Sequence, residues 1–176
     1  MHRRHLLKLG LGAALGFAAL RSALADTSPD TLFLEELTWI EIRDRIAGGK
    51  IVALVPTGGT EQNGPHMALG KHNVIIRHNV AEIARRLGNA LVAPVLPYVP
   101  EGSFEPPEGH MAFPGTLGLS EHAFEVTLRD IATSLALAGF KLICFVGDHG
   151  ESQAIQTSVA RTLSRVWRHR GIRVAN

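Results

Sequence analysis

Two short segments of the sequence concentrate side chains that can bind a metal ion or move protons. The first runs from Gly59 to His66 and reads Gly-Thr-Glu-Gln-Asn-Gly-Pro-His; the second, residues 148–151, reads Asp-His-Gly-Glu. Together, these segments and the nearby His72 offer the mixed nitrogen and oxygen donors that suit zinc or manganese, from Glu61, His72, His149 and Glu151. On spacing alone, a metal site and a set of solvated loop residues are equally good interpretations.

The elements that must position these side chains alternate between strand and helix. Apolar runs predict strands at 51–55, 91–95, 141–146 and 172–175, and helical periodicity predicts helices at 38–47, 73–87, 121–138 and 153–169. Short strands alternating with longer helices predict a three-layer α/β/α fold with a mostly parallel sheet. Since ligands gather beyond the carboxyl ends of such strands, loops 56–72 and 147–152 are expected to converge there.

Three sequence motifs resemble those of the creatininase family. Residues 55–66 are similar to the family's Gly-Ser-x-Glu-Gln-His-Gly-Pro-His loop. Residues 110–116, His-Met-Ala-Phe-Pro-Gly-Thr, are similar to its His-x-x-Phe-Pro-Gly-Thr segment, and residues 139–151 to the stretch that carries its later ligands. The motifs occur in the family's order and cover most of the chain, so the resemblance implies a creatininase-like α/β domain.

The resemblance also implies a ligand set, from which this chain departs at two positions. Family members hold two divalent metals on five ligands, and the positions of three of them fall on Glu61, His149 and Glu151. Asn63 stands where the family has histidine, and His72 stands where it has an aspartate that bridges the metals. An imidazole cannot bridge two cations as a carboxylate does, and an amide oxygen is a weak ligand. We therefore expect one strong site on Glu61, His72 and His149, with the second weakened or absent.

The activity implied by the resemblance is hydrolysis of a C–N bond in a cyclic or other small amide by metal-activated water. Glu151 is a candidate ligand of a residual second site or a candidate general base. Asp148 is a candidate to orient His149, although such an aspartate more often caps the following helix. The resemblance places His66 and His110 in the family's loops, where both are candidates for substrate contact and His110 is also a candidate catalytic residue. Each is also a reasonable loop-packing histidine.

A rival interpretation is a non-catalytic periplasmic protein that keeps the fold and binds a metal or small ligand. The changed ligands favour it, as does the length, because family members usually continue for several strands beyond residue 175. A truncated member, a site completed by a neighbouring subunit and a loss of catalysis all fit that difference. The sheet edge expected at 172–175 favours a homo-oligomer.

The first 25 residues have the pattern of an export signal. Arg3 and Arg4 precede an apolar run, and Ala23-Leu24-Ala25 is a small-x-small cleavage site. The paired arginines resemble a twin-arginine signal, an ordinary secretory signal being the alternative, and they predict a periplasmic domain of residues 26–176. Four of the 18 Lys and Arg residues and no acidic residue lie in this segment, leaving 14 basic and 16 acidic residues. That balance gives no support to nucleic-acid binding, and after cleavage no membrane segment is expected.

Overall fold

The computed structural model describes residues 30–176, so the predicted signal at 1–25 lies outside the described residues. Four parallel strands form one sheet in the order β2-β1-β3-β4. Their bounds are β1 Val52–Thr57, β2 Ala90–Val92, β3 Leu142–Gly147 and β4 Arg173–Ala175. The parallel sheet was predicted from the alternation of strands and helices, and the structure confirms it.

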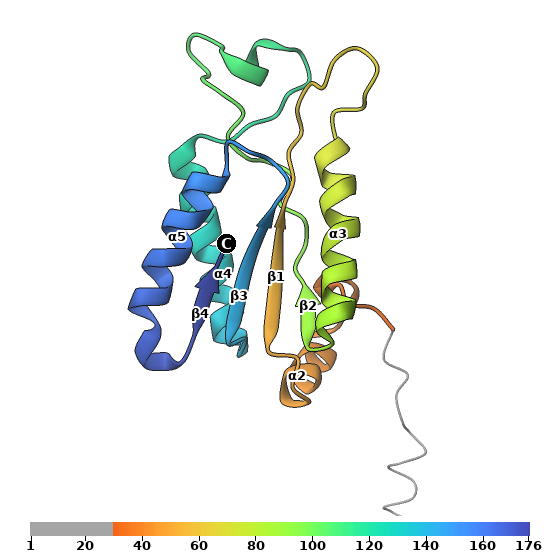
Figure 1. Ribbon diagram of the computed structural model, residues 1–176, viewed down its shortest axis with the longest axis vertical. Coiled ribbons are helices and arrows are strands. Elements are labelled where there is room, and N and C mark those ends of the chain that lie inside the picture. Colours follow the sequence, from red (N-terminus) through yellow and green to blue (C-terminus); the bar gives the residue numbers. More distant parts are fainter. Residues whose placement is uncertain (1–29) are drawn as a thin grey trace, which may run out of the picture. The chain divides into compact units, whose positions relative to one another are not determined.

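Helices cover both faces of the sheet (Figure 1). The α-helices are α2 Trp39–Ala47, α3 Lys71–Leu87, α4 Glu121–Ala138 and α5 Gln153–Val166, and the 3-10 helices are η1 Leu34–Glu36, η2 Gly109–Ala112 and η3 Arg168–Arg170. One face packs against α3 and the other against α4 and α5. All six residues of β1 are buried, as expected of a central strand enclosed on both faces. The architecture is the predicted three-layer α/β/α fold.

Local sequence signals set several helix ends. Thr38 and Glu41 form the reciprocal hydrogen bonds of a capping box at the start of α2, and the Ser120 hydroxyl accepts from the Ala123 N–H at the start of α4. Gly88 and Gly139 end α3 and α4 with positive φ angles of 74° and 116°, a conformation that suits glycine. These four ends follow from residue type alone.

Several element ends differ from the prediction by one to three residues. Helix α3 begins at Lys71 rather than at residue 73, so His72 lies in its first turn instead of in the preceding loop. Strand β2 ends at Val92, three residues before the predicted end at residue 95. Helix α5 ends at Val166, where a 3-10 turn follows.

The sheet leaves one edge strand at each side. Beside β2, Leu32 accepts a hydrogen bond from the Val92 N–H, which partly covers that edge. Among the described residues β4 pairs with no strand other than β3. On its outer side, the Ser164 hydroxyl of α5 accepts from the Val174 N–H at 2.8 Å and donates to the Val174 carbonyl at 2.6 Å. Within residues 30–176, no helix has both the length and the apolar character needed to cross a membrane.

The long loops all leave the sheet at one end. The segments that follow β1, β2 and β3 gather at the carboxyl edge of the strands, at the top of the view in Figure 1. This end therefore collects the polar motifs, which come from three distant parts of the sequence.

Candidate metal centre

Backbone and hydroxyl contacts tie the loop after β1 to the loop after β2. The Leu117 N–H donates to the Thr60 carbonyl at 2.9 Å, and the Gln62 N–H donates to the Thr116 hydroxyl at 3.2 Å. Glu61 lies between these two contacts. Its own N–H donates to the Leu69 carbonyl at 3.1 Å, so the backbone on which this buried carboxylate stands is fixed.

The first turn of α3 supports the same loop. The Asn73 side-chain oxygen accepts a hydrogen bond from the Gly59 N–H at 3.1 Å, and its amide nitrogen donates to the Thr60 hydroxyl at 3.2 Å. Gly58 permits this approach, because a Cβ there would lie only 2.0 Å from the Asn73 oxygen. Gly58 thus allows the loop to pack closely against the first turn of α3.

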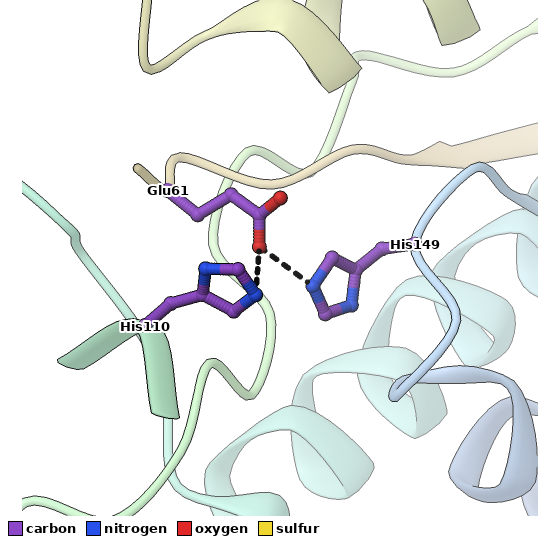
Figure 2. Close-up of side chains that lie close together, drawn as sticks. All are labelled: Glu61, His110 and His149. Atoms are coloured by element: carbon purple, nitrogen blue, oxygen red, sulfur yellow. Dashed lines mark hydrogen bonds and ion pairs between the residues drawn. The ribbon is translucent and has the colours of Figure 1, made fainter. Parts of the chain in front are cut away.

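One carboxylate oxygen of Glu61 lies between two imidazoles (Figure 2). Glu61 Oε2 is 3.0 Å from His149 Nε2 and 3.2 Å from His110 Nε2. The three donor atoms form a compact cluster in which Glu61 and His149 are buried and His110 is half-buried. Gln62 orients His110, because its side-chain nitrogen lies 3.2 Å from His110 Nδ1 and leaves Nε2 facing Glu61.

The other oxygen of Glu61 contacts His72. Glu61 Oε1 is 2.8 Å from His72 Nε2, and His72 Nδ1 is 2.5 Å from Asp148 Oδ2. Both ring nitrogens of His72 therefore face carboxylates, and neither is free for a metal in this arrangement. Asp148, which the sequence made a candidate partner of His149, contacts His72 instead.

A second buried carboxylate, Glu101, reaches the same cluster from the loop after β2. Glu101 Oε2 lies 3.1 Å from His149 Nε2, the nitrogen that also faces Glu61. The hydrogen-bond geometry at this nitrogen is met for Glu61 and not for Glu101. Glu101 is fully buried, and neither of its carboxyl oxygens forms a hydrogen bond with a described residue.

The pKa values of the two buried carboxyl groups, Glu61 and Glu101, shift in opposite directions. Burial raises the pKa of Glu101 above its usual range, and the neighbouring Glu61 adds to this while His149 opposes it. For Glu61, burial also acts upward, but contacts with Glu101, His72 and His149 outweigh it and lower the pKa. The pKa of His149 is raised, first by Glu101 against the effect of burial, and also by Glu61. An imidazole between two buried carboxyl groups is thus biased toward positive charge.

The side chains of three other residues proposed from the sequence for the site do not contact the side chains of the Glu61 cluster. The Asn63 side-chain oxygen accepts a hydrogen bond from the Lys71 ammonium, and its nitrogen donates to the Glu61 carbonyl at 3.1 Å. Glu151 and His66 are exposed, and neither side chain contacts a polar group within the described part of the chain. The proposed roles of these residues as ligand, base and substrate contact stay predictions.

Sequence reasoning missed Glu101 and Gln62. Glu101 lies in a Pro- and Gly-rich loop that also contains Glu105 and Glu108, so residue type did not single it out among the carboxylates of the loop. Gln62 was part of a quoted motif, but nothing in the sequence showed that His110, 48 residues later, would be its partner. Both become visible only when the loops after β1, β2 and β3 meet.

The fold and the site together define a class of protein. They describe a parallel α/β protein with a cluster of one carboxylate and two imidazoles at the carboxyl edge of its sheet, a site that suits a divalent metal. The family model described as creatininase (creatinine amidohydrolase) matches residues 35–174. The chain belongs to the creatininase family.

Individual relatives agree with this assignment. The chain is 32% identical to creatinine amidohydrolase of Pseudomonas putida over 142 residues, which cover 81% of this chain and 54% of that protein. It is 29% identical to the mycofactocin precursor peptide peptidase of Mycolicibacterium smegmatis, covering 62% of this chain and 44% of that protein. A crystal structure of creatininase superposes with a TM-score of 0.72 at 30% identity, covering 83% of this chain and 57% of the other. The chain spans about half the length of the curated relatives it matches.

Proposed function

We propose that this protein binds one divalent metal ion, zinc or manganese, and hydrolyses a C–N bond in a cyclic or other small amide. The observation that carries this proposal is the compact cluster of Glu61, His110 and His149 on a creatininase-family fold. Solved relatives support the choice of metal, since they include a Zn-Zn type of a mutant creatininase and a manganese creatininase. A mutant creatininase complexed with creatine supports a small-molecule substrate.

The spacing of the donor atoms fits a single ion. Ligand bonds of zinc are about 2.0–2.2 Å long, which puts neighbouring donors of a tetrahedral site on the order of 3.3 Å apart. The contacts from Glu61 Oε2 to His149 and His110, at 3.0 and 3.2 Å, are close to that value. The donor chemistry, one carboxylate and two imidazoles, also matches catalytic sites that leave a position for water.

The residues at the two altered family positions support one metal rather than two. The Asn63 oxygen is engaged by Lys71, and His72 is held between Glu61 and Asp148. His72 has a positioning function in this arrangement, because it fixes the Glu61 oxygen that faces away from the two imidazoles. The expectation that His72 is itself a ligand is replaced by this proposal.

In the proposed hydrolysis, different residues of the chain have different roles. When bound, the ion polarises the amide carbonyl and lowers the pKa of water. Glu61 and His149 provide buried ligands, and His110, the most exposed of the three, lies on the side open to substrate. Glu151, exposed and two residues after His149, is our candidate to accept the proton from the attacking water.

The first test of this function is metal content and hydrolysis together. We expect the purified protein to hold one zinc or manganese ion per chain by elemental mass spectrometry, and to hydrolyse at least one amide of a panel that includes creatinine. His66→Ala is the matched control, because His66 is an exposed histidine of the loop that carries Glu61 and should leave metal content unchanged. A folded protein that binds no divalent ion would contradict the proposal, and two ions per chain would contradict the single site.

We also propose that the protein is exported to the periplasm by the twin-arginine route, on the strength of residues 1–25. Replacing Arg3 and Arg4 together by lysine should nearly abolish the periplasmic fraction measured by immunoblot after cell fractionation, because that route requires the arginine pair. Arg21→Lys serves as the control and should export normally. Unchanged export of the double variant would show an ordinary secretory signal instead.

We also propose a homo-oligomer, because β4 has no second partner strand among the described residues. Light scattering of the purified protein would detect it. Nucleic acid and membrane are not proposed as partners.

A further inference from the structure

Glu101 is a buried carboxyl group whose surroundings leave it incompletely paired. Its side chain is fully buried, and its two oxygens form no hydrogen bond with any residue in the described range 30–176. Its one charged contact is with His149 Nε2, 3.1 Å from Glu101 Oε2. A buried carboxyl group that lacks hydrogen bonds is costly, and such groups in native proteins commonly pair with charges or coordinate metals. The position of Glu101 therefore calls for a partner.

The ring nitrogen of His149 that Glu101 faces shows whether Glu101 is placed to orient the histidine or to bind the metal itself. A carboxylate that only orients a metal-binding histidine contacts the ring nitrogen away from the metal. Glu101 instead lies 3.1 Å from His149 Nε2, the nitrogen directed at Glu61 Oε2. His149 Nδ1, where an orienting group would sit, has no hydrogen-bond partner among the described residues. Glu101 is placed as a ligand would be.

The packing around Glu101 holds it there. A Cβ on Gly59 would lie 3.0 Å from Glu101 Oε1, so this glycine leaves the space that the carboxyl group fills. The Glu101 carbonyl accepts a hydrogen bond from the Met111 N–H at 3.2 Å, which joins the backbone of Glu101 to the 3-10 helix that carries His110. The loop after β2 thus delivers two side chains to the cluster.

We propose that Glu101 is an additional metal ligand of this protein. The inference rests on the proposed metal site of Glu61, His110 and His149 and extends it to four donors. These form one continuous row of contacts, from His110 to Glu61, His149 and Glu101, with donor separations of 3.2, 3.0 and 3.1 Å. A dication among them would offset the repulsion between the two buried carboxylates. Glu101 would then provide a ligand in place of Asn63 and His72, whose side chains are engaged by other residues.

The experiment compares Glu101→Gln with Glu108→Gln in the full protein. Glutamine keeps the shape of a protonated carboxyl group but is a poor ligand, and Glu108 is an exposed glutamate of the same loop. Zinc affinity is measured by competition with a chromogenic chelator, coordination by the visible spectrum of the cobalt(II) form, and folding by the Tm of the metal-free protein. For Glu101→Gln we expect more than about 100-fold weaker zinc binding, beyond the usual effect of an outer-shell partner, and an altered cobalt spectrum. The metal-free Tm should not fall, and Glu108→Gln should match the wild type.

The outcomes distinguish this inference from the function on which it rests. If the wild type binds zinc and Glu101→Gln binds it equally well with the same cobalt spectrum, Glu101 is not a ligand and the three-residue site stands. If the folded wild type binds no metal, both proposals are wrong. Should Glu101→Gln not fold, Glu101→Asp, which keeps a carboxylate but draws it back by one methylene, must show weaker zinc binding and a shifted spectrum. Wild-type behaviour of that variant would overturn the assignment.

Discussion

Glu61→Gln is expected to abolish tight metal binding and hydrolysis together. The Glu61 carboxylate contacts three histidines of the site, His72, His110 and His149. An amide in its place removes the negative charge and the carboxylate ligand while keeping the size of the side chain. We expect zinc affinity to fall by more than about 100-fold, since loss of an outer-shell group alone costs up to that amount. Isothermal titration with zinc, beside an amide hydrolysis assay, measures both effects.

Glu151→Gln is the informative comparison for that variant. Its carboxylate is exposed and close in sequence to His149, but it contacts no polar side chain of the described residues. As the candidate general base, it should retain zinc binding and lose hydrolysis. If Glu61→Gln kept wild-type affinity, or if Glu151→Gln alone lost the metal, the site would have been assigned to the wrong carboxylate.

Gly102→Ala is expected to have the largest structural effect of any single methyl group near the site. Gly102 has φ +123°, which L side chains rarely adopt, and a Cβ there would lie 2.0 Å from the backbone oxygen of Glu108. The strained conformation alone costs about 1–3 kcal/mol, and the backbone contact adds to it. The loop must open between Glu101 and His110, so we expect both a lower free energy of unfolding in urea and weaker zinc binding.

Gly70→Ala is the matched control for this loop variant. Gly70 also borders the site, but its φ is −84° and its nearest neighbour to an added Cβ is 3.7 Å away, an ordinary contact. Stability and metal affinity should both stay near those of the wild type. Equal behaviour of the two alanine variants would show that the close approach of residues 102 and 108 does not position the site.

The sequence by itself determined the order of the elements and much of their extent. Thr38 with Glu41, Ser120, and the glycines at 88 and 139 act through contacts within a few residues, so their effects can be read locally. The apolar runs were long and bounded enough to predict the parallel sheet. Family membership was likewise predictable, because three motifs occur in order along the chain, and the family match confirms it.

The tertiary structure decided which side chains meet. In α3, Ile76, Val80 and Ala84 are buried, whereas Ile83 and Leu87, also apolar and at helical spacing, are exposed. Helical spacing alone therefore does not fix which apolar residues face the core. The same dependence on packing applies to the site, where ligand identity is set by distances between loops and not by spacing within one. That is why Glu101, one of three glutamates in its loop, could not be singled out from the sequence.

His72 and His110 show the physical reason most clearly. On spacing, His72 was expected to bind a metal beside Glu61. It does contact Glu61, but its other ring nitrogen faces Asp148, so both nitrogens are engaged. His110 comes from a loop nearly 50 residues beyond Glu61 and meets it because parallel strands bring their carboxyl ends to one edge of the sheet. Local pattern supplied the donor types, and long-range geometry selected among them.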